Sequence, residues 1–341
     1  MDGTGEPEPA TDGETQPDLS RLVEAVRTNL LGDGKYTRTE VAERAGLSLD
    51  EVRALWRALG FATVEDEQRI FTDADVEALK NVQALSAVGE IDDEMMRSMT
   101  RIIGQTFARL ASWQGQLVLQ IIGKSPELLS DGSGERVLEL MSQVTPVVSD
   151  LHSYVWRRQL AAYFARVESN TTANPGAETS LAVGFADMAD FTGFTRRSSE
   201  AELRTVLDRF ETLATDVVGA HQGQIVKTIG DEVLFAADDP HDAAEIALCL
   251  IEEAAADDAL PQLRAGVAFG PVVGRLGDVF GQTVNIASRL TTVARTGSIL
   301  VDAGMADRLR DDDRFALHAL RPVSVRGYSH LRSWRLRRAE R

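Results

Sequence analysis

Residues 185–195 read FADMADFTGFT, and they follow directly on an apolar run that begins at Leu181. The run from Leu181 to Phe185 predicts a buried strand, which would deliver Asp187 to the edge of a sheet. Small residues are frequent in the segment that follows, so we expect a loop whose backbone N–H groups point outward. The stretch therefore predicts a strand, an edge carboxylate and an exposed loop in succession.

A second carboxylate follows a similar pattern further along the chain. Residues 224–229 and 232–236 predict two strands, and Gly230-Asp231 predicts the tight turn between them. Asp187 and Asp231 should then lie at the ends of neighbouring strands, although a turn aspartate is the simpler interpretation for either one alone. Two such carboxylates can hold two Mg²⁺ or Mn²⁺ ions beside a phosphate chain, because hard cations prefer oxygen ligands.

Two more motifs occur in order with this first stretch. Residues 227–231 read KTIGD, and residues 278–289 read DVFGQTVNIASR. Together with residues 185–195, they resemble the catalytic domain of class III nucleotidyl cyclases, and the resemblance extends over about residues 181–336. Several motifs in the right order and spacing are more specific than any single one.

The chain has 341 residues, which is long enough for two domains. In its second half, strands alternate with helices predicted at 200–218 and 241–255. This order favours a ferredoxin-like α+β domain with helices on one face of an antiparallel sheet, preceded by an all-α domain. The expected divisions are a disordered acidic tail (1–17), a helical regulatory domain (18–167), a linker (168–179) and a catalytic domain (180–341).

Residues 39–59 predict a helix-turn-helix, in which Ser48 caps the second helix and Glu51 completes a capping box. This part resembles the helix-turn-helix of MerR-type regulators, which would imply DNA binding. However, acidic residues adjoin Arg53 and Arg57 in the second helix, and the chain carries a net charge of −17. Because neutralising phosphates requires local positive charge, we expect a scaffold for protein contacts and no nucleic acid partner.

Long amphipathic helices are predicted over residues 95–122 and 135–167. Their apolar faces could form a core, contact a partner helix or line a pocket for an apolar ligand such as a fatty acid. The chain has no apolar run near the ~20 residues of a membrane span, and its acidic start lacks a hydrophobic signal region. We therefore expect no membrane span and a cytoplasmic location.

The cyclase resemblance implies roles for the residues around the first strand. It assigns two Mg²⁺ or Mn²⁺ ions per active site to Asp187, Met188 and Asp231. It assigns the β- and γ-phosphates of a nucleotide to the backbone of Phe191, Thr192, Gly193 and Phe194. Near the C-terminus, Arg326 is the candidate for a further basic residue at the phosphates.

Four further positions match residues that contact the base, the ribose and the α-phosphate in this family. Lys227 and Asp278 would read adenine, the lysine at N1 and the aspartate at the exocyclic amino group, whereas guanine presents the reverse pattern. Asn285 and Arg289 lie four residues apart in a predicted helix and share a face. The resemblance implies that Asn285 orients the ribose and that Arg289 stabilises charge on the α-phosphate.

The implied reaction converts ATP to 3′,5′-cyclic AMP and pyrophosphate with two metal ions. In this family, metal-binding and base-reading residues meet across a dimer interface, so we expect a head-to-tail homodimer. The domain order resembles actinobacterial adenylate cyclases whose N-terminal domain restrains catalysis and responds to acidity. His152 could titrate near neutral pH in that domain, although a histidine packed against a helix is the simpler interpretation.

Two alternatives compete with this interpretation. The turn Gly230-Asp231-Glu232 is similar to the Gly-Gly-Asp-Glu turn of diguanylate cyclases, but Ile229 replaces the first glycine and the helix of Asn285 does not belong to that family. A DNA-binding or signal-sensing regulator with an inert cyclase-like domain would have lost a metal aspartate or the α-phosphate arginine. Neither is lost in this chain.

Overall fold

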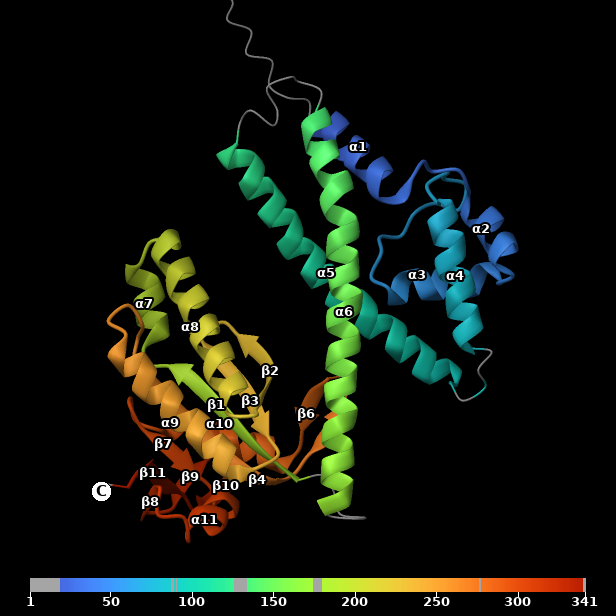
Figure 1. Cartoon of the computed structure of the whole chain (residues 1–341). Helices are drawn as coiled ribbons and strands as arrows, with labels where there is room; N and C mark the ends of the chain where they lie inside the picture. Colours follow the sequence, from blue (N-terminus) through green and yellow to red (C-terminus); the bar gives the residue numbers. More distant parts are fainter. Residues whose placement is uncertain are drawn as a thin grey trace, which may run out of the picture. The chain divides into compact units, whose positions relative to one another are not determined.

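The computed structural model describes residues 19–86, 89, 91–125, 134–173, 180–275 and 277–339. The chain divides into two compact units, residues 1–164 and 165–341 (Figure 1). The predicted acidic tail and residues 174–179 of the predicted linker lie outside the described residues. Within these ranges, every helix falls short of the length or the apolar character that a membrane-spanning segment requires.

The described part of the N-terminal unit is mainly helical, as predicted. Its helices are α1 (Leu19–Leu31), α2 (Arg38–Ala45), α3 (Leu49–Ala58), α4 (Asp73–Ser86), α5 (Asp93–Lys124) and α6 (Glu135–Ala173), the last of which continues into the second unit. A small core joins α2, α3 and α4, and its buried members are Val41, Ala42, Ala45, Val52, Phe71, Val76 and Leu79.

The predicted helix-turn-helix is present in α2 and α3. Gly46 ends α2 with a φ of 69°, a left-handed conformation that glycine adopts without strain. Ser48 caps α3 by accepting a hydrogen bond from the Glu51 N–H, and the Glu51 carboxylate accepts from the Ser48 N–H at 2.7 Å. The predicted capping box is thus confirmed, whereas a relationship to MerR-type regulators stays a prediction.

The long helices α5 and α6 expose many apolar side chains. Gly104 of α5 lies against the end of α3, where an added Cβ would meet the Leu59 carbonyl oxygen at 2.4 Å. His152 of α6 lies beside α5, with its ring centroid 6.0 Å from that of Phe107 and its Nε2 3.0 Å from Gln114 Nε2. Exposed apolar side chains of these helices include Met95, Ile103, Trp113, Leu117, Leu119, Leu140, Val144, Val147, Leu151 and Tyr154.

Helix α6 continues past the predicted helix end at Val167 and reaches Ala173. Residues 168–173 contain neither proline nor glycine, and Pro175 and Gly176 are the first strong helix breakers after them. The first part of the predicted linker is therefore helical.

The C-terminal unit is a mixed α+β structure built on a sheet. Within the described residues, this sheet has seven strands in the order β2 (Gln224–Ile229), β3 (Glu232–Ala237), β1 (Ser180–Met188), β4 (Leu263–Pro271), β7 (Ile299–Val301), β11 (Trp334–Arg338) and β8 (Phe315–Ala319). Strands β4 and β7 are parallel, and the other neighbours are antiparallel. Short hairpins pair β5 (Val273–Arg275) with β6 (Asp278–Phe280), and β9 (Val323–Val325) with β10 (Tyr328–Leu331).

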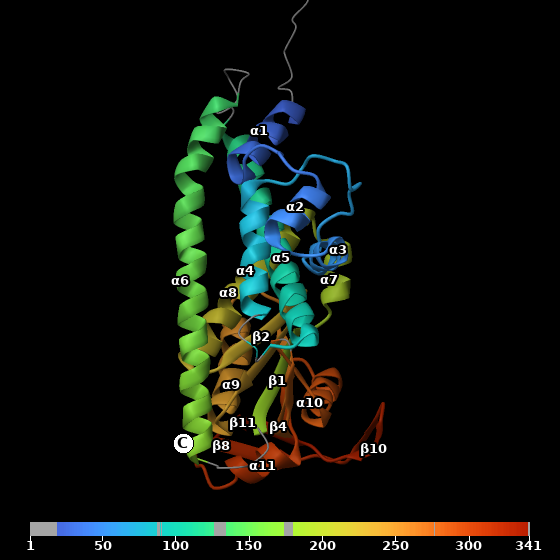
Figure 2. The ribbon, with the colours of Figure 1, turned by 90° about the vertical axis from the view of Figure 1, so that its right-hand side faces the viewer.

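Helices cover both faces of the sheet, so the expectation of helices on one face only was wrong. Figure 2 shows α8 (Glu200–Ala220) and α9 (Pro240–Ala256) on one side of β1 and β4, and α10 (Gln282–Val293) on the other. In β1, Ala182 and Ala186 belong to the core under α8 and α9, whereas Val183 and Phe185 belong to the core under α10. A strand that is apolar on both faces needs a covering layer on each. The remaining helices of this unit are α7 (Phe191–Arg197) and α11 (Ala303–Leu309).

Helix α10 lies directly on β4. The Thr283 hydroxyl donates to the Pro271 carbonyl oxygen at 2.8 Å, near the start of α10. Further along, a Cβ added to Gly266 would meet the Thr291 backbone N at 2.3 Å, so glycine is required for this close approach. The helix therefore runs antiparallel to β4, and its last turn lies near the residues with which β4 begins.

Candidate active site

The structure brings Asp187 and Asp231 together at one edge of the sheet. Asp187 is the penultimate residue of β1, and Asp231 occupies the turn between β2 and β3. The Met188 N–H donates to the Asp231 carbonyl oxygen at 3.0 Å, which ties this turn to the end of β1. The predicted placement of two carboxylates at neighbouring strand ends is therefore confirmed.

A third carboxylate shares this edge. Glu232 is the register partner of Asp187, so both side chains leave the same face of the sheet. Burial raises the pKa of Asp231, and the charge on Asp187 raises it further. Burial raises the pKa of Glu232 to about 7, with further contributions from Asp187 and Asp231. This edge therefore concentrates negative charge.

The carboxylate cluster is not a complete metal site by itself. Within the residues that the structure describes, no group of three or more His, Cys, Asp or Glu side chains is arranged to hold a metal ion. Met188 has a buried side chain on the opposite face, so only its backbone oxygen could serve as a ligand. Oxygens of a substrate or of water would have to complete the coordination of a cation held by Asp187 and Asp231.

Arg264 is a residue of this site that the sequence patterns did not reveal. It lies in β4 directly opposite Asp187, and its Nε and Nη2 donate to Asp187 Oδ2 at 2.8 and 2.5 Å. One signal could have identified it, since Arg264 is the single charged residue in the otherwise apolar run from Leu263 to Phe269. Strand alternation alone, however, does not indicate which neighbouring strand such a residue faces.

The segment after Asp187 forms a short helix, α7, where a loop was expected. Asp190 precedes the helix with a φ of 56°, and the Phe194 N–H donates to the Asp190 carbonyl oxygen at 2.9 Å. The Phe194 N–H is therefore used within the helix, which contradicts its predicted availability for phosphates. Phe191, Thr192 and Gly193 form the first turn, where backbone N–H groups have no acceptor within the helix.

Lys227 and Asp278 lie together although 51 residues separate them. Lys227 Nζ donates to Asp278 Oδ2 at 2.5 Å, and both side chains are only partly exposed. The Val279 N–H donates to the other carboxylate oxygen of Asp278 at 2.8 Å. The predicted pair is therefore assembled within one chain, with one cationic donor and one anionic acceptor side by side.

Asn285 and Arg289 share the face of α10 that is turned away from the sheet. The buried residues of this helix are Thr283, Ala287, Leu290 and Thr291. At about 100° per residue, Asn285 and Arg289 point to the opposite side. The Asp187 carboxylate leaves the sheet surface that the buried side of α10 covers. One chain therefore does not bring Asn285 and Arg289 to its own carboxylates.

Arg326 lies in a hairpin that packs near the end of α10. It occupies the exposed turn between β9 and β10, and this hairpin packs through Val323, Val325 and Tyr328 on the same small core as Leu290 of α10. The phosphate contact of Arg326 stays a prediction.

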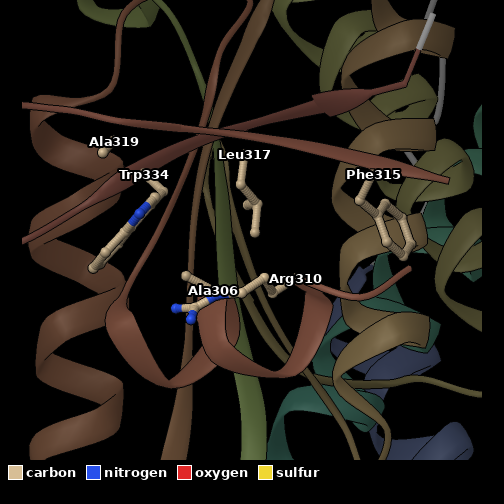
Figure 3. Close-up of a pocket in the computed structure, with 6 residues that line it drawn as sticks. All are labelled: Ala306, Arg310, Phe315, Leu317, Ala319 and Trp334. Atoms are coloured by element: carbon tan, nitrogen blue, oxygen red, sulfur yellow. The ribbon is translucent and has the colours of Figure 1, made fainter. Parts of the chain in front are cut away.

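A cavity of about 260 Å³ lies elsewhere in the C-terminal unit, between α11 and the strands β11 and β8, of which β8 forms the edge of the sheet (Figure 3). Its lining residues are Ala306, Arg310, Phe315, Leu317, Ala319 and Trp334. None of the predicted site residues contributes to it. The chemistry suggested by the sequence therefore belongs to the sheet edge and α10.

Comparison with known families agrees with this division of the chain. The family described as "Adenylate and Guanylate cyclase catalytic domain" matches residues 175–338. The family described as "Adenylate cyclase regulatory domain" matches residues 14–160. The class of protein is thus a nucleotide cyclase catalytic domain preceded by a regulatory domain.

Relatives of known activity show which kind of nucleotide cyclase the chain resembles. An adenylate cyclase of Streptomyces coelicolor is 42% identical over 309 residues, covering 90% of this chain and 80% of the relative. An adenylate cyclase of Glutamicibacter nicotianae is 36% identical, with 91% and 80% covered. A pH-sensitive adenylate cyclase of Mycobacterium tuberculosis is 30% identical, with 93% and 82% covered. The chain belongs to the adenylate cyclase family of enzymes.

Solved structures also resemble the C-terminal unit. The catalytic core of a rhodopsin-guanylyl cyclase with converted specificity, in complex with ATPαS, has a TM-score of 0.45 and 24% identity, covering 48% of this chain and 98% of that one. The adenylyl cyclase CyaB from P. aeruginosa has a TM-score of 0.43 and 19% identity, covering 48% and 97%.

Proposed function

We propose that this enzyme converts ATP to 3′,5′-cyclic AMP and pyrophosphate. The observation that carries the proposal is that this member of the adenylate cyclase family contains two pairs of side chains with complementary chemistry. Asp187 and Asp231 meet at one sheet edge, and Lys227 and Asp278 form a donor–acceptor pair on neighbouring elements. The pair of aspartates suits cations bound to a phosphate chain, and the lysine–aspartate pair suits the hydrogen-bonding edge of adenine.

The donor set fits divalent cations such as Mg²⁺ or Mn²⁺. Asp187 and Asp231 supply hard oxygen ligands, and nucleotide sites commonly use only one or two carboxylates besides phosphate oxygens. Two bound ions would lower the pKa of the ribose 3′-hydroxyl and neutralise the phosphates. Phe191, Thr192 and Gly193 would contact the β- and γ-phosphates through the N–H groups of the first turn of α7.

The base is read by Lys227 and Asp278. The Lys227 ammonium can donate to N1 of adenine, and the Asp278 carboxylate can accept from the exocyclic amino group. Guanine offers a donor and an acceptor in the opposite order, so both groups would face an unsuitable partner. A site that hydrogen-bonds a polar edge discriminates strongly, because the wrong base leaves desolvated groups unpaired.

The residues of α10 act at the sugar and the α-phosphate. Asn285 would orient the ribose so that its 3′-oxygen faces the α-phosphorus. Arg289 would stabilise the charge that develops on the α-phosphate, for which a permanently charged guanidinium with forked donors is suited. Arg326 is the weaker candidate for a further phosphate contact.

Two chains are needed to complete the site. Asn285 and Arg289 face away from the carboxylates of their own chain, so in a head-to-tail homodimer they would complete the site of the partner. Helix α6 offers a second contact between chains. Its exposed residues Leu140, Val144, Val147, Leu151 and Tyr154 follow the alternating four- and three-residue spacing of a coiled-coil seam.

Product analysis of the full chain tests the reaction. The protein is incubated with Mn²⁺ and either ATP or GTP, and the products are separated and weighed by mass spectrometry. We expect cyclic AMP from ATP and little product from GTP. Cyclic di-GMP from GTP would establish the diguanylate cyclase alternative, and the absence of any product would favour an inert cyclase-like domain.

Mixing inactive variants tests the shared site. Asp187→Ala and Lys227→Ala should each be inactive alone, because both sites of each homodimer are damaged. In an equal mixture, half of the dimers are mixed and each has one intact site, so about a quarter of wild-type activity should return. Asp187→Ala mixed with Asp231→Ala is the control, since both changes damage the same half of the site and no activity should return.

We propose further that the helical domain at residues 18–167 regulates the catalytic domain at 180–341. A relative of similar domain coverage is named pH-sensitive, and α6 leads without interruption toward β1 as far as Ala173. Deleting residues 1–170 tests this, and unchanged activity across acidic to alkaline pH would exclude it. A fatty acid bound by the exposed faces of α5 and α6, and a cytoplasmic location, stay predictions within this proposal.

DNA binding by α3 is disfavoured by its ion pairs. Arg53 pairs with Asp50 at 3.0 Å and also with Asp66, which in turn binds the buried Arg38. A guanidinium already held by two carboxylates has little remaining attraction for phosphates. The helix-turn-helix is therefore better explained as a scaffold.

A further inference from the structure

Residues 315–339 form a basic segment in an acidic chain. They contain six arginines, two histidines and no aspartate or glutamate, whereas the whole chain carries a net charge of −17. The segment includes β8, the hairpin of β9 and β10, and β11. Arginine presents forked donors that match the geometry of carboxylates. The last strands of the catalytic unit therefore offer a local surface for acidic groups.

Two of these arginines share one face of β11. Arg335 is the register partner of His318 in β8, and Arg337 leaves the same face because it lies two residues further along the strand. Within the described residues, neither arginine has an ion pair. By contrast, Arg338 points to the opposite face and pairs with Glu245 and Glu252 at 2.8 and 2.9 Å. Two guanidinium groups about 7 Å apart are thus available to carboxylates.

Strand β8 is an open edge of the sheet. It lies last in the strand order, and in the described part of the chain β11 is its single partner. The Leu320 N–H, just after β8, donates to the Ser333 carbonyl oxygen at 2.9 Å. Because antiparallel strands bond through alternate residues, the N–H and C=O groups of Leu317 and Ala319 point to the unpaired side. The strand also lacks the lysine and proline that commonly protect an edge.

The other face of this edge carries the cavity of about 260 Å³. Figure 3 shows that Phe315, Leu317 and Ala319 of β8 line it together with Arg310 of α11. Arg310 already pairs with Asp307 at 2.6 Å, so the remaining lining is mainly apolar. Side chains of a strand added beside β8 would lie about 5 Å from those of β8. Alternate apolar side chains of such a strand would therefore reach the cavity.

We propose that β8 is a docking strand for an extended segment of a partner protein in which acidic and apolar side chains alternate. The backbone groups of Leu317 and Ala319 bond to the segment, as in other cases of strand addition. Its carboxylates face Arg335 and Arg337, and its apolar side chains enter the cavity. This surface is separate from the carboxylates of β1 and the turn after β2, so the inference does not depend on the cyclase reaction.

Other occupants fit the surface less well. Pairing β8 with β8 of a second copy would bring two basic faces together, and like charges across paired strands are destabilising. A nucleic acid would satisfy the arginines, but it has no peptide groups for the open edge and no aliphatic side chains for the cavity. The combination of charge, edge and cavity thus favours a protein segment.

Peptide binding to the full chain tests the proposal. A short fluorescein-labelled peptide in which glutamate and valine alternate is titrated with the protein, and fluorescence anisotropy measures the dissociation constant. Peptides of equal length with alternating lysine and valine, or with alternating glutamate and serine, test the charge and the cavity. We expect each to bind at least about 10-fold more weakly. Equal binding of either peptide, or tighter binding of a short oligothymidylate, would overturn the proposal.

Two protein variants test the two kinds of contact. Arg335→Gln combined with Arg337→Gln should weaken binding of the glutamate–valine peptide about 10-fold. Arg295→Gln combined with Arg308→Gln is the matched control, because it removes two exposed charges outside this face and should leave binding unchanged. Ala319→Pro removes an N–H group on the unpaired side without removing a bond to β11, and it should also weaken binding about 10-fold. If Ala319→Pro or the double arginine variant binds like wild type, the docking strand is wrong.

Hydrogen exchange locates the bound peptide. Backbone amides of residues 315–319 should exchange more slowly in the presence of the glutamate–valine peptide, because the N–H groups of Leu317 and Ala319 become hydrogen-bonded. Mass spectrometry of proteolytic fragments measures this in wild type, whatever the folding of the variants. Binding with unchanged exchange over residues 315–319 would show that the peptide lies elsewhere and would overturn the proposal.

Discussion

The two units of this protein bury their apolar side chains to different degrees. In the catalytic unit, Phe210 and Phe235 are fully buried, and the sheet has an apolar layer on each face. In the described part of the N-terminal unit, the main buried cluster joins α2, α3 and α4, while Val147 and Leu151 of α6 are 67% and 55% exposed. Contiguous apolar surface of this kind usually marks an interaction site. The sheet of the catalytic unit is thus covered on both faces, whereas the long helices of the other unit expose much of their apolar surface.

The largest expected effect is confined to the catalytic unit. Asp187→Asn keeps the size of the side chain but removes the charge that is proposed to bind the metal, and we expect cyclic AMP formation to fall by about 10³-fold. Sedimentation should show an unchanged oligomeric state, because the helical unit is not touched. Activity above a tenth of wild type would contradict the assignment of Asp187.

The second effect should appear in the helical unit. Val147→Glu combined with Leu151→Glu places two charges in the exposed seam of α6, and we expect dimer dissociation to become about 100-fold easier. Analytical ultracentrifugation measures this, and activity should fall at low protein concentration. Ser149→Glu is the matched control, since Ser149 lies on the opposite side of α6, and equal dissociation in both would refute the seam.

A smaller effect tests the packing of α10. Gly266→Ala forces a Cβ against the backbone of Thr291 and should destabilise the catalytic unit by about 1–3 kcal/mol. Gly219→Ala is the comparison, because Gly219 lies in α8 with open space around it and should gain about 0.5–1 kcal/mol from better helix propensity. Thermal unfolding of both variants measures the difference, and a neutral Gly266→Ala would show that α10 can move away from β4.

The smallest effect concerns pH. Asp302 accepts from the Met305 and Phe269 N–H groups at 2.9 and 3.2 Å, yet burial raises its pKa. A carboxyl with a raised pKa holds its proton more tightly in the folded state, so its contribution to the free energy of unfolding falls as pH rises above about 4. Asp302→Asn should remove this pH dependence. The free energy of unfolding of wild type minus that of the variant should therefore fall as pH rises, and it should level off above the raised pKa of Asp302. Denaturant unfolding at several pH values checks the trend, and parallel curves would contradict it.

Local patterns explain how much of this site was predictable. Asp187 and Asp231 follow apolar strands and a glycine turn, which are short-range signals, and the structure brings them together. The segment from Met188 to Phe194 is predicted as a loop because small residues are frequent in it, whereas the structure begins helix α7 at Phe191. Arg264 could not be assigned to Asp187, because the two lie 77 residues apart and only the register of β1 and β4 brings them together. Helical spacing alone predicts that Asn285 and Arg289 share one face of α10. It does not predict that this face points away from the carboxylates of the same chain.

If Lys227 and Asp278 read the base as proposed, their ion pair also affects how base preference can evolve. Each residue neutralises the other at 2.5 Å in a partly buried setting. A single substitution at either position therefore leaves an unmatched charge, which costs stability and weakens the reading of any base. A change of preferred base would require substitutions at both positions. A protein with only one of the two substitutions would be less stable and less active than the protein before or after both changes. Under the proposed base-reading role, the pair would act as an epistatic barrier against a change in the nucleotide that the enzyme accepts.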